Sequence, residues 1–445
     1  MSTNRAILPR CTVFDERTWS EKVIFFDRVH TILTNRVSKT FGSPSAHAAA
    51  DCGIIFRIMK ITDDILYVGV NDHDVDLFEG QFEVPLGMAY NSYVVKAQKV
   101  AVMDTVDVRF GDEWLKNVAA ATDRVDYLVV QHMEPDHSAN IARFAEAYPD
   151  AKIVSSMPAF AMMKNYFGTD FADRRVVVKE GDSLDLGGRS LAFVGAPMVH
   201  WPEVIVTWDA ATGTLFSADG FGKFGANDKV DPEGWDCEAR RYYFGIVGKF
   251  GAQVQALLKK AAGLPIARIC PLHGPVLQTP EEIAHVVKQY QTWSSYGVET
   301  EGVCVAYTSV YGHTKAVVEK FCEILKAKGC PKVACADLAR DDMYETIEDA
   351  FRYGRLVLAT TTYNTGVFPK MEEYIRHLLR RNYQNRKVGL IENGTWGPRA
   401  AKGMKELLSA AKGIEFCGTT VTVKGSMTAE TVAQLEKLAD EILAG

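Results

Sequence analysis

Short apolar runs rich in β-branched residues, separated by turns and helical stretches, fill residues 57 to 297. Runs of this length and composition predict strands. We expect them near residues 65–70, 93–95, 100–103, 127–130, 153–154, 176–178, 191–194, 204–206 and 266–270. Many strands with intermittent helices are typical of an α/β sandwich and not of a helical bundle.

After small polar residues at 294–297 the pattern changes to a regular alternation of strand and helix. Strands are expected at 303–307, 332–336, 356–360, 387–391 and 419–423, and helices at 316–328, 346–353, 370–380, 400–411 and 429–444. Five strands separated by helices predict a doubly wound parallel sheet. We therefore expect an α/β chain with one domain at residues 57–297 and a second at residues 298–445.

Residues 1–56 differ from the rest of the chain, because they show no sustained apolar alternation and contain a small-residue run near residues 43–50. They look like an N-terminal extension. Met59-Lys60 stands directly before a strand-like run, so two explanations stay open, a real appendage and a start codon placed too early. The acidic residues in this segment argue against a targeting peptide.

Composition narrows the class of protein. Hydrophobic residues at 47% and charged residues at 24% favour a folded globular chain. A formal net charge of -6 without any basic run argues against a nucleic-acid partner. No stretch has the roughly 20 apolar residues that span a bilayer, so we expect a cytoplasmic protein without a membrane segment. The nine cysteines form no C-x-x-C pair, which favours reduced thiols and excludes a rubredoxin-like module within this sequence.

A cluster of possible metal ligands follows the expected strand that ends at Val130. The segment Gln131-His132-Met133-Glu134-Pro135-Asp136-His137-Ser138 holds four of them. Positions two apart in a loop leaving a strand project to one side, so His132, Glu134 and Asp136 are expected to converge. His137 is expected to turn inward, where Ser138 would cap the next helix.

Three further candidates lie just past later strands: His200, Asp219 and His273. Any one of the seven alone is more often a polar residue capping a loop. Together they share one kind of place, the junction between a strand and its loop.

This order of ligands is similar to the metallo-β-lactamase-like domain, whose usual zinc signature is H-x-H-x-D-H followed by His, Asp and His. Glu134 replaces the middle imidazole, which makes the pocket richer in oxygen and favours iron or manganese over zinc. Together with the flanking segments at residues 87–93 and 200–202, these ligands make the sequence resemble the flavodiiron protein family, also called A-type flavoproteins. The resemblance covers roughly residues 60 to 445. The resemblance implies a metallo-β-lactamase-like αββα sandwich followed by a flavodoxin-like five-stranded sheet.

The resemblance also implies ligand roles. His132, Glu134 and His200 would hold one iron, Asp136, His137 and His273 the other, and Asp219 would bridge them. In some members of the family water replaces the counterpart of His137, so His137 is expected near the site without a required bond. Glu79 is expected to line the substrate pocket, where some relatives carry His.

Three loops in the second domain are candidates for a flavin site. The first strand-to-helix turn offers hydroxyls and backbone N–H groups for a phosphate, without a cation, and it is neither a dinucleotide loop nor a P-loop. In an open α/β sheet, ligands bind where such loops meet beyond the carboxyl ends of the strands. The candidates are Thr308-Ser309-Val310-Tyr311-Gly312-His313-Thr314, Thr361-Thr362-Tyr363-Asn364-Thr365-Gly366 and Asn393-Gly394-Thr395-Trp396-Gly397.

Tyr363 and Trp396 are expected to lie against a planar ring, although aromatic residues also cover sheet edges. The loops resemble those of flavodoxin, which implies FMN. His313, Glu392-Asn393 and Pro398 depart from the common family pattern and put individual contacts to the ring in doubt.

By the resemblance the chain reduces dioxygen to water, or nitric oxide to nitrous oxide, at a non-haem diiron site that FMN supplies with electrons. The resemblance also implies a head-to-tail homodimer or tetramer and a separate rubredoxin or flavin reductase as electron donor. Two other classes stay open: a metallo-β-lactamase-like hydrolase, and a flavin electron carrier with a silent metal site.

Overall fold

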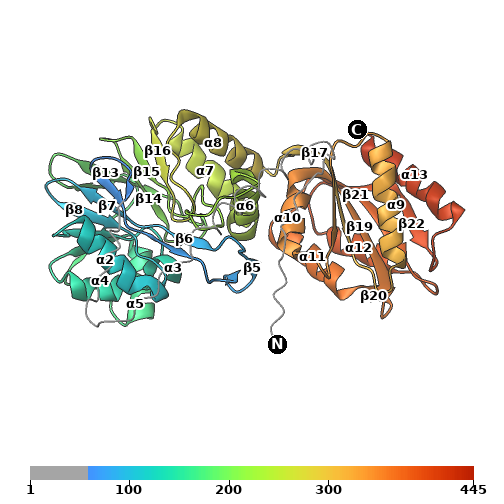
Figure 1. Cartoon of the computed structure of the whole chain (residues 1–445), viewed down its shortest axis with the longest axis horizontal. Coiled ribbons are helices and arrows are strands. Elements are labelled where there is room, and N and C mark those ends of the chain that lie inside the picture. The colour runs from blue at the N-terminus through green and yellow to red at the C-terminus, as the bar shows by residue number, and fades with distance from the viewer. Residues whose placement is uncertain (1–58, 445) are drawn as a thin grey trace, which may run out of the picture. The chain divides into compact units, whose positions relative to one another are not determined.

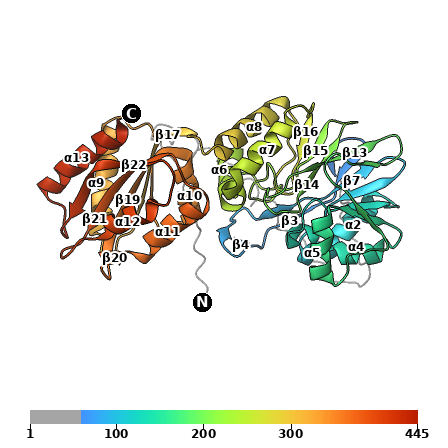
Figure 2. The ribbon, with the colours of Figure 1, turned by 180° about the vertical axis from the view of Figure 1, so that it is seen from behind.

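The computed structural model describes residues 59 to 444, within a compact unit that spans Ile58–Gly445. The expected extension at residues 1–56 lies outside the described residues. Figures 1 and 2 show the helices and strands of the chain from opposite sides.

Two sheets occupy the first part of the described chain. The first sheet has the order β1-β2-β7-β8-β9-β10-β11, antiparallel up to β8 and parallel from β8 onward. The second has the order β12-β13-β14-β15-β16, with only β15 and β16 parallel. The strands are β1 (Met59–Lys60), β2 (Ile65–Tyr67), β7 (Tyr93–Lys96), β8 (Val100–Met103), β9 (Tyr127–Val129), β10 (Lys152–Ser155), β11 (Arg175–Val177), β12 (Ser183–Asp185), β13 (Ser190–Gly195), β14 (Ile205–Asp209), β15 (Thr214–Phe216) and β16 (Arg268–Cys270).

These sheets pack face to face, because one buried cluster joins Tyr93 and Met103 of the first to Phe193 and Phe216 of the second. Helices α2 (Gly111–Ala121), α4 (Ile141–Ala147) and α5 (Met157–Phe167) cover the outer face of the first sheet. Helices α7 (Gly251–Ala261) and α8 (Pro280–Ser294) cover the outer face of the second (Figure 1). The predicted αββα sandwich is therefore confirmed.

Several short elements complete this part of the chain. They are the hairpins β3 (Val70–Asp72) with β6 (Met88–Tyr90) and β4 (Leu77–Phe78) with β5 (Phe82–Glu83), the short helices η1 (Val108–Phe110) and α3 (Pro135–Ser138), and the run of α6 (Trp235–Tyr242), the π-helix η2 (Tyr243–Val247) and η3 (Gly248–Phe250). The strand expected at 65–70 is split, since β2 ends at Tyr67 and β3 joins another sheet. At Gly69 a Cβ atom would lie 2.5 Å from the Tyr90 carbonyl oxygen, so only glycine allows this close crossing.

The last sheet is parallel in the order β18-β17-β19-β21-β22. A short strand, β20 (Gly366–Val367), pairs antiparallel with β19 and was not expected. The parallel strands are β17 (Thr300–Tyr307), β18 (Val333–Asp337), β19 (Tyr353–Tyr363), β21 (Arg386–Asn393) and β22 (Ile414–Val423). Because β18 lies outside β17, the chain reverses its direction of growth between β17 and β19, where α/β sheets bind ligands.

Both faces of this sheet carry helices, which confirms the doubly wound architecture. Helices α9 (His313–Ala327) and α13 (Ala429–Leu443) bury apolar residues against one face. Helices α10 (Met343–Arg352), α11 (Pro369–Arg380) and α12 (Ala400–Leu408) cover the other. The domain boundary at 297 stays a prediction; α8 ends at Ser294 and β17 begins at Thr300.

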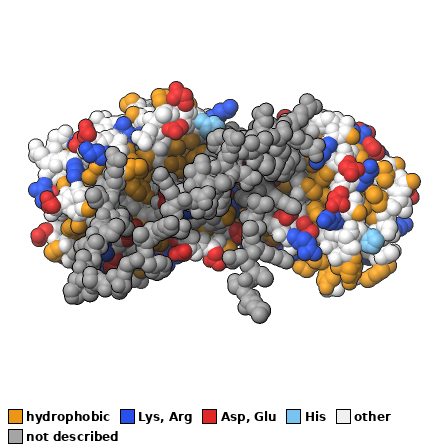
Figure 3. All heavy atoms as spheres, viewed as in Figure 1, with side chains coloured by type: hydrophobic (Ala, Val, Ile, Leu, Met, Phe, Trp, Pro, Cys, Tyr) orange, Lys and Arg blue, Asp and Glu red, His pale blue; other side chains and the backbone are white. Residues whose placement is uncertain are grey.

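Helix length and the distribution of charged side chains can be read from the described residues. Within residues 59 to 444, no helix is both long and apolar enough to cross a bilayer. Acidic and basic side chains are interspersed over the coloured surface in Figure 3.

Candidate metal centre and flavin loops

The seven predicted metal ligands stand where strands or their loops end at one edge of the two packed sheets. His132 and Glu134 follow β9, and Asp136 and His137 lie in α3. His200 precedes β14, Asp219 follows β15, and His273 follows β16. The structure brings all seven together in two groups: His132, Glu134, His200 and Asp219 form one, and Asp136, His137 and His273 form the other.

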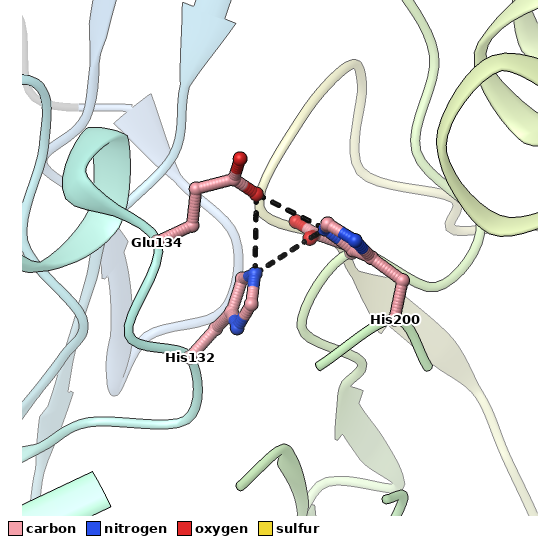
Figure 4. A group of neighbouring side chains, drawn as sticks. His132, Glu134 and His200 are labelled. Carbon is pink, nitrogen blue, oxygen red and sulfur yellow. Dashed lines mark hydrogen bonds and ion pairs between the residues drawn. The ribbon is translucent and has the colours of Figure 1, made fainter. Parts of the chain in front are cut away.

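In the first group the polar atoms converge on one point (Figure 4). The Glu134 Oε2 atom lies 3.3 Å from His132 Nε2 and 3.0 Å from His200 Nε2. Asp219 Oδ2 lies 3.2 Å from His132 Nε2 and 3.1 Å from His200 Nε2. Two imidazoles and two carboxylates therefore present one atom each to a shared centre, as ligands of a single ion would.

The second group repeats this arrangement beside the first. Asp136 Oδ2 lies 3.4 Å from His137 Nε2 and 3.3 Å from His273 Nε2, and the two imidazole nitrogens are 2.9 Å apart. The other oxygen of Asp219, Oδ1, lies 3.5 Å from His137 Nε2 and 3.8 Å from His273 Nε2. Asp219 thus directs one oxygen to each group.

The buried carboxylates show that these residues fit a pair of cations. Both oxygens of Asp136 and of Asp219 are buried without a hydrogen-bond partner in the described chain, although imidazole nitrogens surround them. Unpaired buried carboxylate oxygens are unfavourable unless a positive charge compensates them. Imidazole and carboxylate together suit iron, whereas a purely thiolate set would suit softer metals.

The pKa values of the candidate ligands also indicate that these residues fit a pair of cations. Burial lowers the pKa of His200, but the nearby carboxylates of Asp219 and Glu134 outweigh burial and raise it to about 9. Burial raises the pKa of Asp219, but the charge of His132 and the surrounding imidazoles hold it well below its usual range. Without metal, protons on the imidazoles balance the carboxylates, and bound cations would replace those protons.

The three predicted flavin segments lie at the carboxyl ends of β17, β19 and β21, at one edge of the parallel sheet. The second was expected to be a loop, but Thr361 to Tyr363 still belong to β19 and Gly366 begins β20. Thr314 is buried, and its Oγ1 lies 3.1 Å from Thr361 Oγ1 and accepts from Asn393 Nδ2 at 3.4 Å. Thr308 Oγ1 lies 2.5 Å from Thr360 Oγ1. Hydrogen bonds between side chains therefore hold the three loops together.

The first loop forms an open turn at the N-terminus of α9. Gly312 has φ +88°, and a Cβ atom there would meet nothing within 4 Å. The Ser309 hydroxyl accepts from the backbone N–H groups of Gly312 and Lys315, both at 3.1 Å. The first-turn N–H groups of a helix lack intrahelical partners, so this open space beside α9 suits a phosphate.

Aromatic side chains stand exposed around these loops. Tyr311 is 90% exposed, Trp396 76% and Tyr363 47%. Exposed aromatic faces beside a helix N-terminus fit a planar ring that carries a phosphate, which is the chemistry of FMN. Their contacts with the ring stay a prediction.

Comparisons with known proteins identify the family. A family model described as ODP family beta lactamase matches residues 88–274. The solved rubredoxin oxygen:oxidoreductase from Desulfovibrio gigas has a TM-score of 0.82 and 27% identity, covering 87% of this chain and 98% of its own. The flavodiiron protein from Giardia intestinalis, at 22% identity, shares the fold with a TM-score of 0.81 over 87% of this chain and 96% of its own. The nitric oxide reductase of Moorella thermoacetica is 30% identical over 366 residues, which cover 80% of this chain and 90% of the relative.

This chain belongs to the flavodiiron protein family. The resemblance stated from the sequence is therefore confirmed, while the role of each ligand stays a prediction. The position of Asp136 in the loop did not predict correctly which ligands it joins. The chain turns into α3 at Pro135, so Asp136 joins His137 and His273 instead of lying beside His132 and Glu134.

One local expectation for this flavodiiron chain was wrong. Ser138 does not cap a following helix; it lies inside α3, and its hydroxyl donates to the Met133 carbonyl at 2.9 Å. Glu134 and Asn140 occupy the N-cap positions of α3 and α4. The hydroxyl of Ser138 instead ties α3 back to the ligand loop.

Two buried carboxylates of the flavodiiron site were missed from the sequence. Asp104 Oδ1 accepts from the backbone N–H of Gln131 at 2.7 Å, and Glu203 Oε1 accepts from His132 Nδ1 at 2.8 Å. Asp104 follows the apolar strand β8, and Glu203 precedes β14. A signal existed, because each is an acidic residue directly beside an apolar strand, the same kind of place as the ligands.

A cavity of about 240 Å³ opens beside the two metal-ligand groups. Its lining includes Glu79, Tyr90, Arg109, Glu134 and Asp136. Burial and the nearby Glu134 raise the pKa of Glu79 to about 7. Glu79 therefore shares a cavity with two predicted ligands, as the resemblance implied.

A fourth flavin-side loop, after β22, was also missed. Asn393 donates to the Gly425 carbonyl and accepts from the Gly425 N–H, both at 3.0 Å. Ser426 Oγ lies 3.4 Å from His313 Nδ1. Gly425 and Ser426 stand at the same edge of the sheet as the predicted loops, so the strand expected at 419–423 could have indicated them.

Proposed function

We propose that this flavodiiron protein reduces dioxygen to water, nitric oxide to nitrous oxide, or both, at a non-haem iron pair that FMN supplies with electrons. The name of the Moorella relative supports nitric oxide as a substrate, and that of the Desulfovibrio structure supports oxygen and a rubredoxin donor. One observation carries the proposal: Asp219 directs its two oxygens to two separate groups of ligands.

In this proposal His132, Glu134 and His200 would hold one iron, and Asp136, His137 and His273 would hold the other. Asp219 would offer one oxygen to each. Such a pair supplies redox chemistry and two adjacent coordination sites for diatomic molecules, and FMN supplies electrons singly or in pairs. The protein's own part is to hold the ligands rigidly in a buried pocket, since every predicted ligand except Glu134 is buried.

The cavity beside the ligands gives small molecules a way to the site. Tyr90 and Glu79 line it together with Glu134 and Asp136. Reduction of either gas consumes protons, and Glu79 can exchange a proton near neutral pH because its pKa lies at about 7. We assign Glu79 to holding a proton at its carboxylate beside the cavity.

FMN would occupy the loops after β17, β19 and β21. The N-terminus of α9 would receive the phosphate, and Tyr363 and Trp396 would lie against the ring. Support comes from the exposure of both aromatic residues and from the open turn at Gly312. These loops and the metal ligands lie in different sheet systems, which supports separate domains at residues 57–297 and 298–445.

A head-to-tail homodimer, alone or within a tetramer, would bring the flavin of one copy to the irons of the other. Large apolar side chains are exposed around the flavin loops, at Val310, Tyr311, Tyr363, Trp396 and Met427. Leu77, which lines the cavity beside Glu134, is also exposed. Exposed apolar side chains around the flavin loops, with Leu77 beside the metal cavity, suit an interface between two copies.

Mixing two inactive variants tests this arrangement. A Glu134→Ala protomer lacks iron and a Thr314→Leu protomer lacks flavin, so turnover that returns on mixing requires electrons to cross between copies. Mixed samples that exchange subunits but stay inactive would contradict the head-to-tail arrangement.

The donor would be a separate rubredoxin or flavin reductase, and the protein would work in the cytoplasm. The names of the Desulfovibrio structure and of the Megalodesulfovibrio gigas relative support a rubredoxin donor. Reduction rates with each donor type, measured anaerobically by flavin absorbance, distinguish the two.

The function itself is tested on protein whose iron and FMN contents have been measured. The protein is reduced anaerobically and mixed in a stopped-flow instrument with dioxygen and, separately, with nitric oxide. Rapid reoxidation to water or nitrous oxide supports the proposal. Two zinc ions with ester or lactam cleavage would establish the hydrolase, and slow reoxidation that releases superoxide or peroxide would establish a plain flavin carrier.

A further inference from the structure

Glu203 lies behind His132, on the side away from the other predicted ligands. Its side chain is only 2% exposed. One oxygen, Oε1, accepts two hydrogen bonds of 2.8 Å, from His132 Nδ1 and from the backbone N–H of Met133. The Ser156 hydroxyl donates to the Glu203 carbonyl at 2.8 Å and fixes the backbone. Glu203 is thus held in place from two directions.

This contact determines which nitrogen of His132 is available to a metal. With its proton on Nδ1 and shared with Glu203, the ring leaves Nε2 unprotonated. Nε2 is the atom that lies 3.3 Å from Glu134 Oε2 and 3.2 Å from Asp219 Oδ2, facing the centre of the first group. Glu203 therefore selects the tautomer that can bind iron.

Within the described residues, His132 is the one basic side chain that pairs with the Glu203 carboxylate. Among residues 59 to 444, no lysine or arginine lies within ion-pair distance of it, and His132 is its ion-pair partner. Its second oxygen, Oε2, is buried without a hydrogen-bond partner in the described chain. The negative charge consequently acts mainly on the His132 ring and on whatever that ring binds.

Within the described chain, no carboxylate accepts a hydrogen bond from a ring nitrogen behind the histidines of the second group. His273 Nδ1 lies 2.7 Å from the Ala89 backbone carbonyl, which is a neutral acceptor. His137 Nδ1 is buried and has no hydrogen-bond partner in that part of the chain. The buried Asp104 carboxylate acts on His137 only through its charge, because its hydrogen bonds go to Gln131 and to the His132 backbone N–H. The two groups therefore hold similar ligands but differ in the carboxylate that is hydrogen-bonded to a ligand ring.

We propose that Glu203 is a positioning residue that makes the two irons inequivalent. It fixes His132 with Nε2 toward the metal and lowers the reduction potential of the iron held by His132, Glu134 and His200. A carboxylate behind an imidazole makes the ring a stronger donor, and its negative charge favours the ferric over the ferrous ion. The inference rests on the proposed function, since it requires an iron pair bound by these residues.

An ion held by His132, Glu134 and His200 would therefore be harder to reduce than an ion held by Asp136, His137 and His273. The identity of the ligands alone does not give this difference.

Two variants separate the charge of Glu203 from its shape. Glu203→Gln keeps an oxygen that can accept from His132 Nδ1 and from the Met133 N–H but removes the negative charge. Glu203→Asp keeps the negative charge but shortens the side chain. Potentiometric titration with Mössbauer detection follows each iron, and transfer of ferrous iron to a chelator measures how firmly it is held. The readouts do not depend on gas turnover.

For Glu203→Gln we expect the oxidation equilibrium of one iron to shift about tenfold toward ferrous, which is about 59 mV for a one-electron couple. Iron transfer to the chelator should become about tenfold faster. Glu203→Asp should stay near the wild-type potential. Asp209→Asn is the control, because Asp209 is a buried carboxylate at the far end of β14 that pairs with Arg189.

Unchanged potentials and iron release in Glu203→Gln, in protein whose wild type binds two irons and reduces the gases, would overturn this inference and leave the proposed function intact. Equal shifts of both irons, or a Glu203→Asp variant that behaves like Glu203→Gln, would also overturn it. A wild-type protein without an iron pair would overturn both proposals.

Discussion

The metal centre and the flavin loops of this chain are built in opposite ways. Around the metal centre the chemistry lies in side chains, which are buried, charged and already converged on two points. Around the flavin loops it lies in backbone N–H groups, hydroxyls and exposed aromatic rings. The first site is complete except for cations, whereas the second needs its ligand to cover it.

This difference governs how each site should respond to substitution. Removal of one buried ligand leaves other buried carboxylates without compensation, so its effect should be large and confined to the metal. Removal of one contact to FMN leaves many others in place, so its effect should be graded. Substitutions at Glu134, Thr314, His137 and Trp396, in decreasing order of effect, test this contrast.

Glu134→Ala or His200→Ala should remove iron and lower turnover by at least about 100-fold, because changes to the groups behind a ligand alone already cost about 10- to 100-fold. FMN content should be unchanged, since the flavin loops lie in another sheet. Metal analysis and flavin absorbance measure both. Glu180→Gln is the control, an exposed acid that pairs with Lys260. Loss of iron and FMN together would show that the two sites are not independent.

Thr314→Leu should do the reverse, emptying the flavin site and leaving iron in place. Thr314 is buried and its hydroxyl links two flavin loops, so a bulky apolar side chain removes the link and crowds the turn. Loss of this link and crowding of the turn should weaken FMN binding about 10- to 100-fold. Titration of the apoprotein with FMN measures the affinity. Thr314→Ser keeps the hydroxyl and should bind FMN almost normally; equal loss in both variants would refute the assignment.

His137→Ala should weaken iron binding by about tenfold, less than the loss of Glu134. Asp136, His273 and one oxygen of Asp219 remain in its group, and water can fill the position of the imidazole. Chelator-transfer kinetics compare the variants directly. A His137→Ala protein as depleted in iron as Glu134→Ala would show that His137 is an obligatory ligand.

Trp396→Ala should have the smallest effect, a roughly two- to tenfold weaker FMN affinity, as expected for the loss of one aromatic contact. Trp396 is largely exposed, so its removal should leave folding unaffected. Fluorescence titration with FMN gives the affinity, and Trp396→Phe should restore most of it. An unchanged FMN affinity in Trp396→Ala would show that the flavin ring does not lie against Trp396.

Much of the fold and the convergence of the seven candidate ligands could be predicted because they follow local rules. Strand-to-loop junctions indicated the seven side chains that the structure brings together, and alternating strands and helices indicated the parallel sheet. Glu203 and Asp104 could not be assigned roles, since their contacts depend on loops that meet only in the folded chain. The pairing of Asp136 with His273 likewise depends on the turn into α3. β15 was not predicted, since its three residues contain neither Val nor Ile, whereas the equally short β9, β11 and β16 each contain one or more of them.

Diffraction at the iron absorption edge is the decisive measurement for the proposed iron pair. Crystals of the as-isolated protein should give two anomalous peaks about 3.5–4 Å apart, the usual spacing of two-metal sites. One peak should lie among His132, Glu134 and His200, the other beside Asp136 and His273, with an oxygen of Asp219 bound to each. A single peak, or peaks at the zinc edge alone, would contradict the assignment of two irons to these ligands.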